Sequence, residues 1–183
     1  MPITPDTKDW TWVLERACPE CGFDVRAFAR AEVGTMIREN ATTWQTLLAH
    51  PDAWRRPRDD VWSGLEYGCH VRDVFILYFE RLQLMLEQDD PLFPNWDQDA
   101  AAVENAYHRQ DPGEVAASLR ASADRLAGAF DGLAPSDWER RGRRSDGAVF
   151  TIESFARYLI HDPIHHVHDV TRNLEVIAAQ RKR

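Results

Sequence analysis

The chain has 183 residues, of which 44% are hydrophobic, which is enough for one globular domain whose core needs no disulfides. Its formal net charge of −8 argues against a nucleic-acid-binding surface, which would need a basic face. Because there is no apolar run long enough to span a bilayer and no secretory pattern in the first residues, we expect a cytoplasmic protein that binds neither nucleic acid nor membrane.

Residues 1–24 are predicted to be an N-terminal extension of a single domain that covers residues 1–183. The extension holds the motif Cys-Pro-Glu-Cys at Cys18 and Cys21. This pair could be half of a zinc site, a redox pair or two thiols in an ordinary turn. We favour the ordinary turn, because the only other cysteine is Cys69 and a four-thiolate zinc site would need a second pair.

The rest of the chain has helical periodicity. Apolar residues recur at steps of three and four in four long segments, and a shorter helical patch precedes the third. These helices are expected at about 25–48, 64–88, 98–109, 113–132 and 152–179. Asp24, Ser63 and Thr151 are candidate N-caps, and Ser63 forms a capping box with Glu66. No segment alternates with period two for long enough to build a sheet, so we predict an all-α four-helix bundle with long crossover connections.

The last helix contains the sequence YLIHDPIHHVHDV, with four histidines within eight positions. His161 and His165 are four residues apart and therefore share a face, whereas His166 is rotated by about 100° and should point elsewhere. His70, in the second long helix, lies on an apolar stripe. Burial of its imidazole there without a partner would cost about 2 kcal/mol or more. We predict that His70, His161 and His165 form a metal site. The alternative is that they are core histidines bonded to carbonyl oxygens.

Ligand histidines usually donate their second N–H to a carboxylate or a carbonyl. Asp73 lies one turn after His70, and Asp169 lies one turn after His165, so both are candidate orienting residues; solvent-exposed helix charge is the alternative. His168 roughly shares the side of His165. Pro163 should kink the helix near the predicted ligands, because it lacks an N–H and crowds the preceding turn.

The sequence WSGLEYGCHVRDV, followed by H-x-x-x-H in the last helix, resembles the DinB-like (DinB/YfiT) superfamily of four-helix-bundle metalloenzymes. The superfamily includes mycothiol- and bacillithiol-dependent transferases. The resemblance implies a divalent ion, zinc or nickel, bound by His70, His161 and His165 with water in its open positions. It also implies a homodimer and a low-molecular-weight thiol as a co-substrate.

We therefore expect a divalent-metal-dependent enzyme that acts on a small molecule. The resemblance favours a thiol-dependent S-transferase, in which the metal presents a thiolate to an electrophile. A metal-dependent hydrolase and a non-catalytic, stress-associated metal- or ligand-binding bundle are the alternatives, since a shared fold does not fix function.

Overall fold

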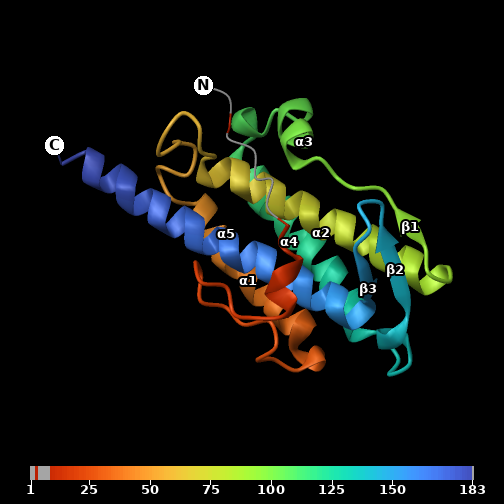
Figure 1. Ribbon diagram of the computed structural model, residues 1–183. Coiled ribbons are helices and arrows are strands. Elements are labelled where there is room, and N and C mark those ends of the chain that lie inside the picture. The colour runs from red at the N-terminus through yellow and green to blue at the C-terminus, as the bar shows by residue number, and fades with distance from the viewer. Residues whose placement is uncertain (1–2, 4–8, 183) are drawn as a thin grey trace.

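The computed structural model describes residue 3 and residues 9–182, so residues 1–2 and 4–8 of the predicted extension lie outside the described part. Five α-helices occur in the described residues (Figure 1). They are α1 (Val33–Leu48), α2 (Gly64–Glu87), α3 (Gln98–Glu104), α4 (Pro112–Asp131) and α5 (Ile152–Gln180). The four long helices form a bundle in which α1 and α2 each pack against both α4 and α5. The predicted all-α four-helix bundle is confirmed.

The helix starts follow the capping pattern of the sequence at α2 and α5. The Glu66 carboxylate accepts from the Ser63 backbone N–H at 2.9 Å, and the Ser63 hydroxyl accepts from the Glu66 N–H at 3.2 Å. At the start of α5, the Thr151 hydroxyl accepts from the Ser154 N–H at 3.1 Å. Each cap satisfies backbone donors that the helix itself leaves unpaired.

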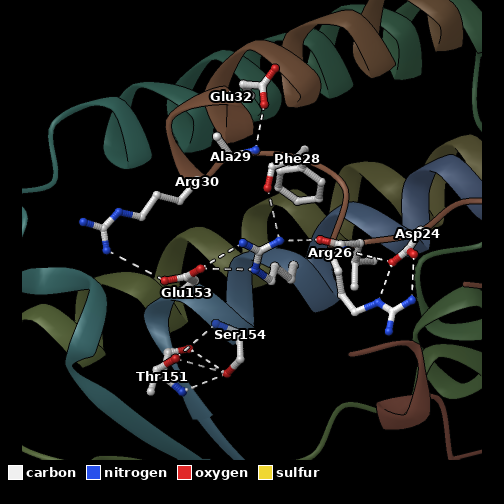
Figure 2. Close-up of polar contacts among 11 residues, drawn as sticks. Asp24, Arg26, Phe28, Ala29, Arg30, Glu32, Thr151, Glu153 and Ser154 are labelled. Carbon is white, nitrogen blue, oxygen red and sulfur yellow. Dashed lines mark hydrogen bonds and ion pairs between the residues drawn. The ribbon is translucent and has the colours of Figure 1, made fainter. Parts of the chain in front are cut away.

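The first helix begins later than predicted, at Val33, so the assignment of Asp24 as its N-cap is wrong. Asp24 instead pairs with Arg26 within a turn (Figure 2). Arg157 of α5 donates to the backbone carbonyls of Val25 and Phe28. These contacts hold residues 25–28 against α5 in turn and bend conformations, and a short 3-10 helix (Arg30–Glu32) follows before α1. Tertiary contacts thereby override the local helical spacing.

A small sheet covers one end of the bundle (Figure 1), contrary to the expectation that no sheet would form. Its strands are β1 (Leu92–Phe93), β2 (Arg141–Arg144) and β3 (Val149–Thr151). β1 pairs with β2 in parallel, and β2 pairs with β3 antiparallel with Gly142 opposite Phe150. Strands of two to four residues are too short to show a period-two pattern in the sequence.

The core lies between the four long helices and contains large apolar side chains from each. Its fully buried members include Ile37, Trp44, Phe75, Leu82, Leu119, Leu126, Phe155 and Leu159. Among the helices that the structure describes, none combines the length and the apolar character that a membrane span requires. The polar residues buried beside this core include His70, His161 and His165.

Candidate metal centres

Helix α5 carries the histidine-rich segment and runs through Pro163 without interruption. The expected kink therefore does not break the helix. The rings of His161 and His165 remain close, with centroids 5.1 Å apart. Asp162 and His166 have the same four-residue spacing, one position further along, and so lie on the adjacent face of the helix. Two pairs of candidate ligands thus point from α5 in two directions.

One of these pairs meets α2. His70, Asp162 and His166 offer ligand atoms that all lie within 4.8 Å of one another, and we call them the histidine–aspartate cluster. His70 Nε2 lies 3.5 Å from Asp162 Oδ2, and His166 Nε2 lies 3.5 Å from Asp162 Oδ1. The cluster joins the second and last long helices of the bundle.

The cluster contains buried polar atoms that make no hydrogen bond in the described structure. They are both ring nitrogens of His70 and Oδ2 of Asp162, although the Asp162 side chain as a whole is 34% exposed. Leaving such groups unpaired costs about 1–3 kcal/mol each. A divalent cation would satisfy a carboxylate oxygen and two imidazole nitrogens together, so the donor set fits a metal ion.

Aromatic rings surround the histidine–aspartate cluster. Trp96 stacks on His70 with a centroid distance of 5.4 Å, and the ring of Trp62 is tilted against His70 at 5.5 Å. Tyr67 packs on His166 at 4.8 Å. A cleft of about 1600 Å³ reaches Asp162 and His166 and is lined by these three aromatic residues. A small molecule in the cleft could therefore reach Asp162 and His166 between aromatic side chains.

The acidic neighbours of His166 shift its pKa. Burial lowers the pKa of His166, but Asp162 and Asp169 outweigh burial and raise this pKa to about 9. Burial raises the pKa of Asp162, yet His166 and His70 hold it well below its ordinary value. A metal ion bound here must displace the imidazole proton, so metal affinity should fall as the pH falls.

The other pair on α5 faces the N-terminal extension. His161 and His165 lie with Cys18 and Cys21, and the ligand atoms of all four are within 4.8 Å of one another. We call these residues the cysteine–histidine cluster. Burial, with a smaller contribution from His165, lowers the pKa of His161 to about 4, and burial also lowers the pKa of His165. Both imidazoles are therefore neutral near pH 7, as metal ligands must be.

The structure thus divides the three predicted ligands between two clusters. His70 lies with Asp162 and His166, whereas His161 and His165 lie with the two cysteines of the extension. The sequence interpretation rightly placed His166 on a different face from His165, but did not recognise that this is the face toward His70. The four-residue spacing of Asp162 and His166 was the signal that could have revealed it.

Of the predicted orienting residues Asp73, His168 and Asp169, only Asp169 lies beside ring nitrogens of the two clusters. Asp169 Oδ2 lies 3.1 Å from His166 Nδ1 and 3.6 Å from His165 Nε2. Asp73 instead accepts hydrogen bonds from the Tyr107 hydroxyl and from Arg72. The ring of His168 is 6.4 Å from that of His165, and its Nε2 is buried without a hydrogen bond. Of these candidates, Asp169 is placed to orient ring nitrogens in both clusters.

Together, the bundle and the two clusters define a helical protein with candidate metal centres between its last long helix and its neighbours. The model of the DinB superfamily matches residues 38–170, and the chain belongs to this superfamily. The matched region contains the histidine–aspartate cluster but not the cysteines of the extension.

The chain is also similar to a solved structure, YfiT from Bacillus subtilis, with a TM-score of 0.70 and 18% sequence identity. The similarity covers 80% of this chain and 87% of YfiT, which is described as a probable metal-dependent hydrolase with an unusual four-helix bundle topology. At this identity the likeness concerns the fold. No curated protein matches the chain.

Proposed function

We propose that the protein is a divalent-metal-dependent enzyme that acts on a small molecule, with the ion held by His70, Asp162 and His166. The observation that carries the proposal is the convergence of ligand atoms from His70, Asp162 and His166 beside a large cleft, which Asp162 and His166 line. Three protein ligands leave at least one position open on a divalent ion, which is characteristic of catalytic rather than structural sites. Membership of the DinB superfamily supports the same conclusion.

Residues around the histidine–aspartate cluster orient one of its ligands and pack against another. The chemistry that such an ion supplies when bound is to lower the pKa of a coordinated water toward about 7 or to deprotonate a coordinated thiol. Asp169 accepts from Nδ1 of His166, which leaves Nε2 directed at Asp162. Trp62 and Trp96 pack against His70, which is almost completely buried.

The reaction that we propose is thiol-dependent S-transfer, with zinc or nickel as the ion and a low-molecular-weight thiol as the co-substrate. The thiol would lose its proton to solvent, and its sulfur would form a bond to an electrophilic carbon of the second substrate, while the bond from that carbon to an anionic leaving group would break with the electron pair going to the leaving group. The cleft suits a polar small molecule, because Arg58, Arg144 and Arg172 line it together with aromatic side chains. The predicted homodimer and the cytoplasmic location remain predictions.

A metal-dependent hydrolase is the second candidate. Two imidazoles and one carboxylate are a ligand set that hydrolytic zinc enzymes use. The description of YfiT as a probable metal-dependent hydrolase points the same way. The two reactions differ in what the open coordination position accepts, a thiol or a water molecule.

Turnover assays distinguish these reactions and test the cluster. Zinc- or nickel-loaded protein would be tested for consumption of small thiols with monochlorobimane and for hydrolysis of p-nitrophenyl acetate. The His166→Ala variant should lose activity by about 100-fold or more, since it removes a ligand. The matched control is His108→Ala, because His108 is exposed in a short 3-10 helix and belongs to neither cluster. Equal activity of His166→Ala and the control would contradict the proposed metal mechanism.

A further inference from the structure

The N-terminal extension is folded into a tight turn where its two cysteines lie. The Gly22 N–H donates to the Cys18 carbonyl at 2.8 Å, and the Cys18 N–H donates to the Phe23 carbonyl at 2.9 Å. Gly22 has a φ of +76°, a left-handed conformation that side chains disfavour. This backbone directs the side chains of Cys18 and Cys21 toward the same face of α5.

The sulfur atoms of this turn meet two imidazoles. Cys18 Sγ lies 3.6 Å from His165 Nδ1, and Cys21 Sγ lies 3.8 Å from His161 Nε2. In tetrahedral zinc coordination, with Zn–S of about 2.3 Å and Zn–N of about 2.0–2.1 Å, neighbouring sulfur and nitrogen ligands are about 3.6 Å apart. Cys18, His161 and His165 are also almost completely buried, at 1%, 4% and 6% exposure.

We propose that Cys18, Cys21, His161 and His165 form a second metal site, which binds zinc and fastens the N-terminal extension to α5. Two cysteines separated by two residues, combined with two histidines four residues apart on a helix, are a ligand set that zinc prefers. The sequence could not reveal the site, because about 140 residues separate the two halves of the ligand set, and the cysteines lack a second pair.

The charges of the two clusters indicate different roles. Two thiolates balance the charge of Zn²⁺, so four ligands of this kind make a neutral, closed centre that is inexpensive to bury. Two histidines and one aspartate leave a divalent ion with a net positive charge and an open position. The cysteine–histidine cluster is therefore a structural site, whereas the histidine–aspartate cluster is suited to binding an anion or a polarised substrate.

The surroundings of His165 support this assignment. Because Nδ1 of His165 faces Cys18, its Nε2 is available to a carboxylate, and both Glu20 and Asp169 have an oxygen 3.6 Å from it. A carboxylate behind a ligand histidine fixes the orientation and tautomer of the ring. A disulfide between Cys18 and Cys21 would use neither histidine, and all three cysteines are free in the structure.

The extension that this site would hold forms part of the cleft wall. Trp10, from the extension, packs on His161 and His165 with centroid distances of 5.4 and 4.9 Å. Trp10, Leu14 and Glu20 line the same cleft as Asp162 and His166. By holding the extension on α5, the zinc would complete one wall of this cleft.

Cobalt(II) is a spectroscopic probe that tests the site directly. Wild-type protein exchanged with cobalt should show a thiolate-to-cobalt charge-transfer band and intense visible bands of tetrahedral coordination. The Cys18→Ser/Cys21→Ser variant should lose both features, whereas His70→Ala and the matched cysteine control Cys69→Ser should keep them. Absence of the bands from cobalt-bound wild type, or their persistence in the double variant, would overturn the proposal.

X-ray absorption of the zinc-loaded wild type provides a second test that needs no variant. Two sulfur ligands at about 2.3 Å per cysteine–histidine site are expected, and a first shell without sulfur would contradict the site. These outcomes are distinguishable from failure of the proposed function, which would leave the sulfur signature intact while no turnover was detected.

Trypsin tests whether the zinc fastens the extension. Chelation should raise cleavage after Arg16 at least about tenfold, because ligand binding stabilises the docked form by mass action. Cleavage after Arg58, in a connection outside the extension, should not change. Equal protection of the extension with and without zinc would show that the ion does not hold it, and would overturn that part of the proposal.

Discussion

His165 and His166 are consecutive in the sequence, yet their ring planes differ by 74° and they belong to different clusters. An α-helix turns by about 100° per residue, so adjacent side chains face different neighbours. In α5 one of these neighbours is the N-terminal extension, and the other is α2. Asp169, one turn further along, reaches both rings through the same carboxylate oxygen.

Replacing Asp169 should therefore weaken metal binding at both clusters. We expect Asp169→Asn to lower each metal affinity by about 10- to 100-fold, the usual effect of removing a carboxylate that orients a ligand histidine. The affinities can be measured by competition with a chromophoric chelator. Asp73→Asn is the matched control, because Asp73 bonds to Tyr107 and Arg72. If the two variants had equal affinities, the orienting role of Asp169 would be wrong.

Metal binding to the histidine–aspartate cluster should stabilise the fold through His70. The ring nitrogens of His70 are buried and make no hydrogen bond, and Nε2 faces Asp162 Oδ2 at 3.5 Å. With zinc at about 100 times the dissociation constant of this cluster, wild type should gain about 2.7 kcal/mol of unfolding free energy that His70→Leu lacks. Denaturant titration with zinc and with chelator measures the gain, and an equal gain at this cluster in both proteins would contradict the role of His70 as a ligand.

The cap of α2 should make the fold sensitive to acid. Burial raises the pKa of Glu66, but Arg56 and Ser63 outweigh it and hold the pKa below its ordinary value of 4.5. The stabilisation that this carboxylate provides is therefore complete well above pH 4.5 and is lost as the pH falls below that value.

The Glu66→Gln variant tests this pH dependence. In chelator, which removes the separate effect of metal release, wild type should be more stable than the variant at neutral pH. The difference should shrink as the pH is lowered through the acidic range, because protonated Glu66 resembles glutamine in charge. Denaturant titrations at several pH values measure it, and a difference that stays constant would show that the charge of Glu66 does not stabilise the fold.

Gly142 should be required where the small sheet packs on α2. A Cβ at Gly142 would lie 2.8 Å from Met85 Cγ and 2.9 Å from Phe93 Cε1. Gly142→Ala should therefore cost about 1–3 kcal/mol of stability through overpacking. Gly128→Ala is the control, because a Cβ there meets nothing within 4 Å and alanine favours the helix by about 1 kcal/mol. Thermal unfolding should move in opposite directions for the two variants, and a shared direction would contradict the packing argument.

Much of the fold was predictable because its signals are local. Ser63 with Glu66 and Thr151 mark the helix starts that the structure confirms. The start of α1 was not predictable, since residues 25–28 before it are held in turn and bend conformations by Arg157, which is more than one hundred residues away in sequence. The short strands were missed because two to four residues carry no periodicity.

The candidate sites were predictable only in part. Residue type and spacing identified His70, His161 and His165 as candidate ligands, and their roles as ligands remain predictions. The grouping could not be derived, because it depends on which face of α5 meets α2 and which meets the extension. Helix packing sets those faces through contacts that are distant in sequence. For the same reason, the partnership of Cys18 with His165 could not be read from either motif alone.

The most direct test of two separate centres is the metal content of protein purified without a histidine tag and loaded with zinc. Elemental analysis should find about two ions per chain in wild type, one for each set of ligands. His70→Ala and Cys18→Ser/Cys21→Ser should each retain about one ion, because each variant disrupts a different cluster. Loss of a single shared ion in both variants would instead show that the histidines of α2 and α5 form one centre.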